Sequence, residues 1–121
     1  GLTGKQAEAA MFRCGVTLNA NALPFDKNGP WWTSGIRVGT PAVTTLGMTK
    51  EDMKEIASII NLVLQGTKPG LTKEGKPAKG KIEIDAAVEE EGKKRVNALL
   101  SKYVLYPELD LDFLKAEFVK D

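Results

Sequence analysis

The residue best placed to do chemistry is Arg37, which stands between Gly35 and Gly39. Alternate residues of a β-strand share one face, so in a strand these three residues point the same way. The glycines would leave open space around the guanidinium, whose planar donor fork matches a carboxylate or a phosphate in bidentate fashion. The spacing indicates an anion-binding arginine. An arginine paired with an acid of this chain, beside glycines that serve a β-bulge, is the alternative.

Two residue types limit other chemistry. The 121 residues include no histidine, which excludes Ser–His–Asp and Cys–His catalysis and histidine metal ligands within this chain. Cys14 is the single cysteine, so an intrachain disulfide and an all-cysteine metal site are excluded. We expect Cys14 to be a small buried side chain in a protein of a reducing compartment, and we expect no metal site.

Charge is balanced overall and uneven along the chain. Lys and Arg number 17 against 16 Asp and Glu, so the net charge of +1 implies no nucleic-acid partner. Residues 67–81 hold five lysines and one glutamate, whereas residues 107–121 hold two lysines and five acids. No apolar stretch approaches the ~18 residues of a membrane span, and the beginning of the chain lacks the apolar core of a secretory signal. We expect no membrane partner.

The elements that must position Arg37 can be read from caps and periodicity. Thr3 and Gln6 form a capping-box pair at the start of a helix that is expected to end at Gly15. One face of this helix carries an apolar stripe of Ala7, Ala10, Met11 and Cys14. Alternating apolar residues predict strands over 16–19 and 33–40, with Ile36 and Val38 facing the core. Further helices are expected from Thr49 to Gly66 and from Asp85 to about Leu105, the second with the i,i+4 ion pairs Glu89–Lys93, Glu90–Lys94 and Glu91–Arg95. Residues 67–81 are expected to be a flexible lysine-rich loop or hairpin. Residues 107–121 are expected to be an acidic tail, whose apolar residues form a final short helix or a docked tail.

Three helices separated by few and brief strands favour one α+β domain over residues 1–121, arranged as a two-layer α/β sandwich. A doubly wound sheet would need longer strands in alternation with the helices.

The residues around Arg37 also resemble a family. Residues 33–42, Thr-Ser-Gly-Ile-Arg-Val-Gly-Thr-Pro-Ala, resemble a signature near the C-terminus of serine hydroxymethyltransferases. The flanks agree in order and spacing: residues 1–10, 16–26 and 44–48 resemble the family's neighbouring segments, and residues 105–109 resemble its closing segment. The resemblance is tight over 1–60, loose over 82–109, and missing in the lysine-rich segment.

The resemblance implies the small C-terminal domain of a fold-type I enzyme that uses pyridoxal phosphate to interconvert serine and glycine with tetrahydrofolate. It gives Arg37 the role of binding the substrate carboxylate and points to Asn21 at the folate. The family's cofactor lysine and histidine belong to a large catalytic domain, so this chain should hold no catalytic residue and no bound cofactor. Alone it should be inactive; the full-length enzyme is expected to be a cytoplasmic homodimer or tetramer.

Two other interpretations stay open. A free-standing domain could bind or sense an amino acid through Arg37, although one exposed carboxylate–arginine contact is screened by water. The lysines of 67–81 could bind nucleic acid, but no aromatic residue lies between them to stack on bases. These lysines could instead contact the acidic tail, in the same or another subunit.

Overall fold

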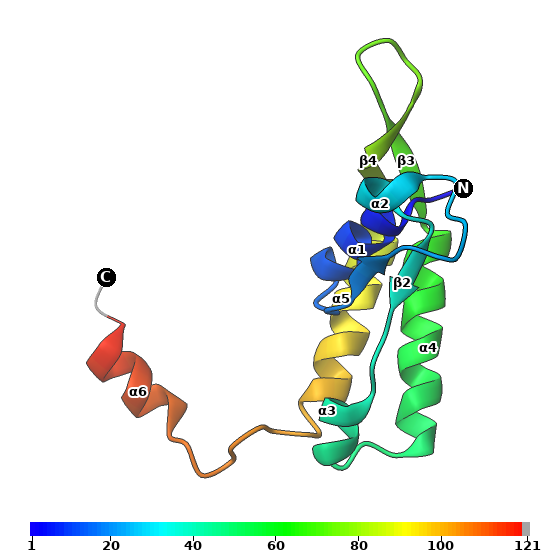
Figure 1. Ribbon diagram of the computed structural model, residues 1–121. Helices are drawn as coiled ribbons and strands as arrows, with labels where there is room; N and C mark the ends of the chain where they lie inside the picture. Colours follow the sequence, from blue (N-terminus) through cyan, green and yellow to red (C-terminus); the bar gives the residue numbers. More distant parts are fainter. Residues whose placement is uncertain (120–121) are drawn as a thin grey trace.

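The computed structural model describes residues 1–119, in which helices stand beside two small antiparallel sheets (Figure 1). The predicted α+β class is confirmed. The elements in chain order are α1 (Gly4–Arg13), β1 (Asn19–Asn21), α2 (Gly29–Trp32), β2 (Gly35–Arg37), α3 (Pro41–Thr45), α4 (Lys50–Gln65), β3 (Thr67–Leu71), β4 (Pro77–Ile84), α5 (Ala86–Leu100) and α6 (Leu111–Phe118).

Helix α1 forms as its sequence predicts. The Thr3 hydroxyl accepts from the Gln6 backbone N–H at 3.2 Å, and the Gln6 side chain accepts from the Thr3 N–H at 2.9 Å. Gly15, with φ of +82°, follows the end of the helix, where a residue without Cβ adopts this conformation freely. Every member of the expected apolar stripe is buried, Cys14 among them: Ala7, Ala10, Met11 and Cys14.

The core lies where α1, α4 and α5 meet. Gly92 allows α5 to pack closely against α1 and α4, since a Cβ at this position would lie 3.1 Å from Cys14 Sγ and 3.1 Å from Val63 Cγ2. Side chains of all three helices then pack in one cluster with little space between them. The cluster consists of Ala10, Met11, Cys14, Ile59, Val63 and Val96.

Helices α4 and α5 begin where the sequence predicts, but α5 ends earlier than predicted. Thr49 and Asp85 are the N-caps, and α4 ends before Gly66, as expected. Helix α5 ends at Leu100 and not near residue 105, because the chain turns and the Tyr103 hydroxyl donates to Asp52 at the start of α4, at 2.6 Å.

Arg95 corrects the predicted ion pairs along α5. Its guanidinium donates twice to Glu55 of α4, at 2.8 Å each, and so makes an interhelical bond instead of the expected pair with Glu91. The predicted pair of Glu89 with Lys93 is present at 2.6 Å.

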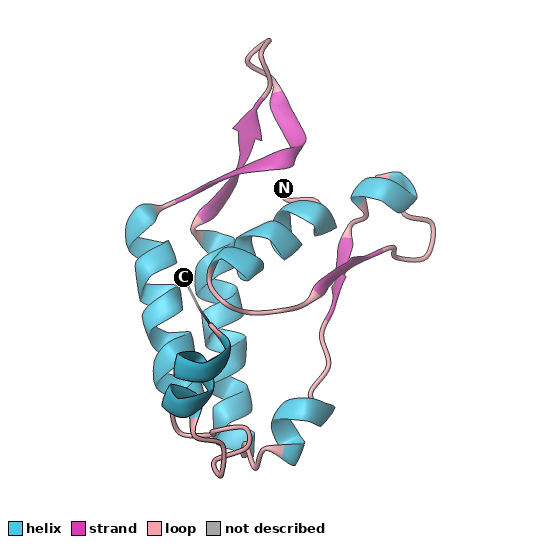
Figure 2. Ribbon diagram, turned by 90° about the vertical axis from the view of Figure 1, so that its left-hand side faces the viewer, coloured by secondary structure: helices cyan, strands magenta, loops and turns pink. Residues whose placement is uncertain are grey.

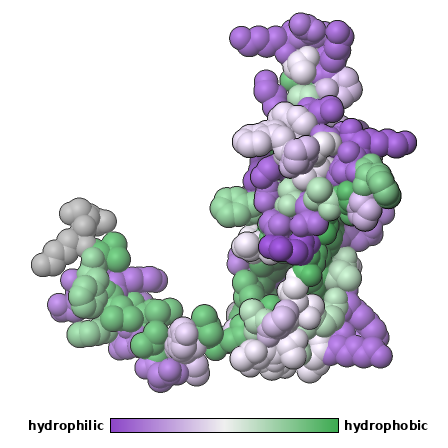
Figure 3. Space-filling model, viewed as in Figure 1, coloured by the Kyte–Doolittle hydropathy of each residue, from purple (hydrophilic) through white to green (hydrophobic). Residues whose placement is uncertain are grey.

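Residues 67–81 form β3, the turn and the first part of β4, so the hairpin is the one of the two expected forms that is present (Figures 1 and 2). The cap of α1 anchors β4, the second strand of the hairpin. Gln6 Nε2 donates to the carbonyls of Ala78 and Lys81 at 2.6 and 2.8 Å, and the Thr3 hydroxyl donates to the carbonyl of Lys79 at 2.7 Å. The lysines themselves are exposed, and the hairpin tip is mainly hydrophilic (Figure 3).

Helix α6 occupies the acidic tail and stands away from the body on an extended segment, far from the hairpin in both ribbon views (Figures 1 and 2). The Asp110 carboxylate caps it by accepting from the N–H groups of Asp112 and Phe113. The alternative in which the lysines contact the acidic tail is therefore not seen within the described part of one chain, and a contact with the tail of another subunit is untested. None of the described helices is long and apolar enough to cross a membrane.

Candidate functional site

Arg37 ends strand β2, directly opposite Asn19 of β1 in an antiparallel register. The strand is shorter than predicted, covering residues 35–37 where the pattern indicated 33–40, and β1 lies at residues 19–21 where 16–19 was expected. The Arg37 side chain is exposed, and its Nε donates to Asn19 Oδ1 at 3.1 Å. The Arg37 guanidinium is thus held by the neutral side-chain amide of Asn19 on the neighbouring strand.

The alternative in which Arg37 pairs with an acid of this chain is not seen in the described part. Among residues 1–119 no carboxylate oxygen lies within 4.0 Å of the guanidinium, and Asn19 is its one hydrogen-bond partner. Four N–H donors on the two terminal nitrogens stay available. A charged planar fork with free donors is the feature that binds a carboxylate in bidentate fashion.

The two glycines beside Arg37 are not equivalent, which corrects the prediction that both leave space for a ligand. A Cβ at Gly35 would lie 2.7 Å from Leu23 Cδ2 and 2.9 Å from the Asn21 carbonyl oxygen, so the missing side chain makes room for the 21–26 segment. A Cβ at Gly39 would meet only Pro41 Cδ, at 3.7 Å. Only the Gly39 side is open.

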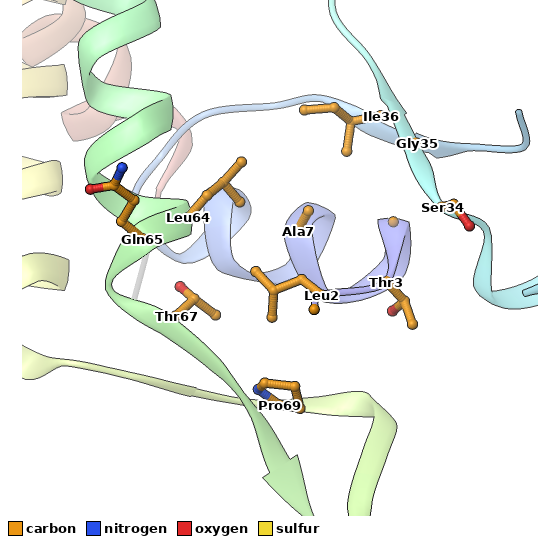
Figure 4. Close-up of a pocket in the computed structure, with 12 residues that line it drawn as sticks. Leu2, Thr3, Ala7, Ser34, Gly35, Ile36, Leu64, Gln65, Thr67 and Pro69 are labelled. Atoms are coloured by element: carbon orange, nitrogen blue, oxygen red, sulfur yellow. The ribbon is translucent and has the colours of Figure 1, made fainter.

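The opposite face of the segment also differs from expectation. Ile36 is half-buried and lines a cavity of 460 Å³ between β2, the start of α1 and the end of α4, as Figure 4 shows with Leu2, Ala7 and Leu64 around it. Val38 is 50% exposed, not buried in the core. The β1–β2 ribbon has no third strand beside it among residues 1–119, which leaves these apolar side chains partly uncovered.

Helix α1 holds both strands of the ribbon. The Gly4 N–H donates to the Thr33 carbonyl before β2 at 2.9 Å, and the Ala20 N–H of β1 donates to Glu8 Oε1 at 3.2 Å. Lys5 bonds the same carboxylate at 2.9 Å and, as the largest cause, lowers the pKa of Glu8. The Asn19–Arg37 pair therefore stands on a helix that is itself part of the core.

Asp26 organises the loop that joins the two strands, a role that sequence reasoning missed. Its carboxylate accepts from the Ser34 hydroxyl at 2.6 Å and from the N–H groups of Leu23, Asn28 and Ser34 at 2.7–3.1 Å. These bonds, the Ser34 hydroxyl first, lower the pKa of Asp26 to about 2. The dense turn residues around it were the available signal, because Asp caps turns through such bonds.

Asn21, the residue expected at the folate, lies on the same strand as Asn19 and shares its face. Its side chain is exposed and donates to the Ala22 carbonyl at 3.0 Å. The structure brings Asn21 and Arg37 to one small sheet, at opposite ends of its three-residue register.

The two tryptophans of α2 lie against α1 and β4 and not beneath the Arg37 strand. Trp31 is 72% exposed, and Trp32 covers Gly80 of β4, where a Cβ would lie 2.6 Å from the indole ring. Both line a cavity of 480 Å³ with Phe12 and with Lys5.

These cavities do not fit pyridoxal phosphate, which needs an amine to bind covalently and donors for its phosphate. Lys5 is the one lysine among the residues that line the three described cavities, and its ammonium is bonded to Glu8. Residues 1–119 also hold no group of three potential metal ligands. What the arrangement can do is anchor an anion at Arg37.

Comparison with known proteins agrees with the resemblance of the Arg37 segment. The family model described as serine hydroxymethyltransferase matches residues 1–60. The serine hydroxymethyltransferase of Treponema pallidum is 52% identical over 120 residues, 99% of this chain and 21% of the relative. The enzymes of Salinispora tropica and Chlamydia pneumoniae are each 46% identical, over 92% and 94% of this chain and 23% of their own length.

The chain therefore spans about a fifth of the length of the curated relatives that it matches. The identities extend over nearly the whole chain, well beyond the segment that carries the signature. This chain belongs to the serine hydroxymethyltransferase family.

Proposed function

We propose that this chain is the C-terminal small domain of a pyridoxal-phosphate-dependent serine hydroxymethyltransferase, and that Arg37 binds the carboxylate of its serine or glycine substrate. One observation carries the proposal: the exposed Arg37 guanidinium has free terminal donors and no carboxylate partner within residues 1–119. A bidentate arginine is the usual protein ligand for a planar carboxylate.

The remaining roles follow from the family. A large catalytic domain of the same enzyme would hold pyridoxal phosphate, which when bound supplies the electron sink for transfer of a one-carbon unit between serine and tetrahydrofolate. Asn21 would contact the folate. Residues 1–121 would form one domain, in a cytoplasmic homodimer or tetramer where Cys14 stays reduced.

Arg37 is tested in the full-length enzyme with Arg37→Lys and Arg37→Gln. Truncation of one member of a desolvated charge pair costs about 2–5 kcal/mol, so kcat/KM for serine should fall at least 30-fold with glutamine. Lysine keeps the charge but loses the fork, and should recover part of the loss. Arg13→Lys is the matched control, because Arg13 is an exposed arginine that pairs with Glu89 of α5 and not with a residue of the β1–β2 ribbon. If kcat/KM for serine is the same in all three variants as in the unaltered enzyme, the role of Arg37 is refuted.

The role of Asn21 is tested with Asn21→Ala, measured with each substrate separately. KM for tetrahydrofolate should rise while KM for serine stays unchanged, since the Asn21 side chain bonds only the Ala22 carbonyl within the described chain. A rise in KM for serine alone would place Asn21 at the amino acid and not at the folate.

The length of the natural protein separates the enzyme from a free-standing amino-acid-binding or regulatory domain. The enzyme predicts an intact mass four to five times the 13.1 kDa of this chain, because the chain covers 21% and 23% of its relatives. A free-standing domain predicts 13.1 kDa and measurable binding of glycine to the chain alone. We expect titration calorimetry of the chain with glycine to show no binding, and serine cleavage assays of the chain to show no activity.

A further inference from the structure

We propose that Asn19 is a positioning residue that fixes how Arg37 receives a carboxylate: it occupies Nε and leaves the two terminal nitrogens as the binding fork. This inference rests on the proposed function of Arg37. A guanidinium can bind a carboxylate side-on, through Nε and one terminal nitrogen, or end-on, through both terminal nitrogens. With Nε donating to Asn19 Oδ1 at 3.1 Å, the end-on fork remains.

The orientation of the Asn19 amide is set by a second bond. Its Nδ2 donates to the Ala20 carbonyl at 3.1 Å, so the amide nitrogen faces a backbone acceptor and the amide oxygen faces Arg37. A flipped amide would place two donors against Nε–H and would lose both bonds. The backbone of the same strand is fixed in turn by the bond of Ala20 N–H to Glu8 on α1.

The residue type at position 19 also matters for charge. An amide oxygen orients the guanidinium without neutralising it, so the full positive charge remains for a ligand. Aspartate has nearly the same shape but would carry a carboxylate at the place where the amide oxygen now lies, 3.1 Å from Nε. That internal carboxylate would occupy and neutralise the cation in competition with the substrate.

The experiment compares Asn19→Asp and Asn19→Ala in the full-length, cofactor-loaded enzyme. Binding of glycine is followed at equilibrium by the visible absorbance of the cofactor, so turnover is not needed. Asn19→Ala should weaken glycine binding about threefold through loss of orientation, and Asn19→Asp about tenfold or more through charge competition, on the scale of the net effect of a single hydrogen bond.

Methylamine, which is glycine without its carboxylate, separates positioning from general damage. Both Asn19 variants should bind methylamine as tightly as the unaltered enzyme, because only the carboxylate contacts Arg37. The pair Asn61→Ala and Asn61→Asp is the matched control, since Asn61 is an exposed asparagine of α4 whose side chain, within residues 1–119, bonds only Gln65. These two variants should change neither affinity.

The possible results are distinguishable. If Arg37→Gln weakens glycine binding but Asn19→Asp and Asn19→Ala do not, the positioning role is wrong and the proposed function stands. If Arg37→Gln has no effect on glycine binding, the proposed function itself fails. If the Asn19 variants weaken methylamine and glycine equally, Asn19 acts on the fold and not through Arg37, which also overturns the inference.

Discussion

Substitution by alanine should destabilise the fold at Gly35 but not at Gly39, although the two glycines stand symmetrically about Arg37 in the sequence. At Gly35 a methyl group would lie 2.9 Å from the Asn21 carbonyl oxygen of the paired strand and 2.7 Å from Leu23 Cδ2. At Gly39 the methyl group would meet Pro41 Cδ at an ordinary 3.7 Å. Neither glycine has a positive φ, so the difference comes from space and not from backbone strain.

The loss of folding stability expected for Gly35→Ala depends on which neighbouring group can move away from the added methyl group. Leu23 is 51% exposed, and its methyl group can rotate away at little cost. The Asn21 carbonyl cannot, because it belongs to the backbone that pairs with Gly35 itself. Overpacking of this kind costs about 1–3 kcal/mol, and with one of the two contacts relieved we expect about 1–2 kcal/mol. Gly39→Ala should be neutral or should stabilise by about 0.4–1 kcal/mol, because it restricts the unfolded chain.

The assay is urea unfolding of both variants and of the unaltered protein, followed by far-ultraviolet circular dichroism and by the fluorescence of Trp31 and Trp32. The expected result is a lower midpoint for Gly35→Ala with an unchanged slope, and an equal or higher midpoint for Gly39→Ala. Equal midpoints for the two variants would refute the reasoning, since the structure would then have no tighter contact at Gly35 than at Gly39.

Three further outcomes are expected from buried or hydrogen-bonded groups. Met11→Ala removes a fully buried side chain from the helix core and should lower the free energy of unfolding by about 2–5 kcal/mol, as measured in urea. Cys14 is 1% exposed and burial raises the pKa of its thiol, so alkylation should be slow in the folded protein and fast in urea; equal rates would contradict its burial. The folded pKa of Asp26 is about 2, against a usual value of 3.8, so its stabilising effect is complete above about pH 4 and is lost as the pH falls toward 2. Asp26→Asn should therefore flatten the loss of stability over that range in acid titrations.

Local signals predicted the helices well because those signals act within a few residues. The Thr3–Gln6 capping box, the stripe that ends at Cys14 and the cap at Thr49 all depend on neighbours in the chain, and each lies where the sequence indicated. The same locality explains the misses. Helices α2 and α3 were not predicted, because they span only four and five residues and are too short to show the helical periodicity of apolar residues.

Features that depend on a partner from elsewhere in the chain could not be predicted. Arg95 stands four residues after Glu91, and its bond to Glu55 requires knowledge of how α4 and α5 pack. The site shows the same limit. The alternation around Arg37 identified the arginine, but the contact that Gly35 makes and the bond from Asn19 arise from the pairing of β1 with β2.

The position of Arg37 depends on α1 more than on its own sheet. A ribbon of two three-residue strands is marginal in water, so it needs support from other elements. That support comes from the Gly4 bond to Thr33 and the Glu8 bond to Ala20, on the same helix whose cap holds the hairpin. A change in the cap of α1 should therefore disturb the hairpin and the arginine together. Substitutions at the exposed hairpin tip, residues 72–76, should leave Arg37 in place. Among residues 1–119 no hydrogen bond or ion pair connects this tip to the β1–β2 ribbon.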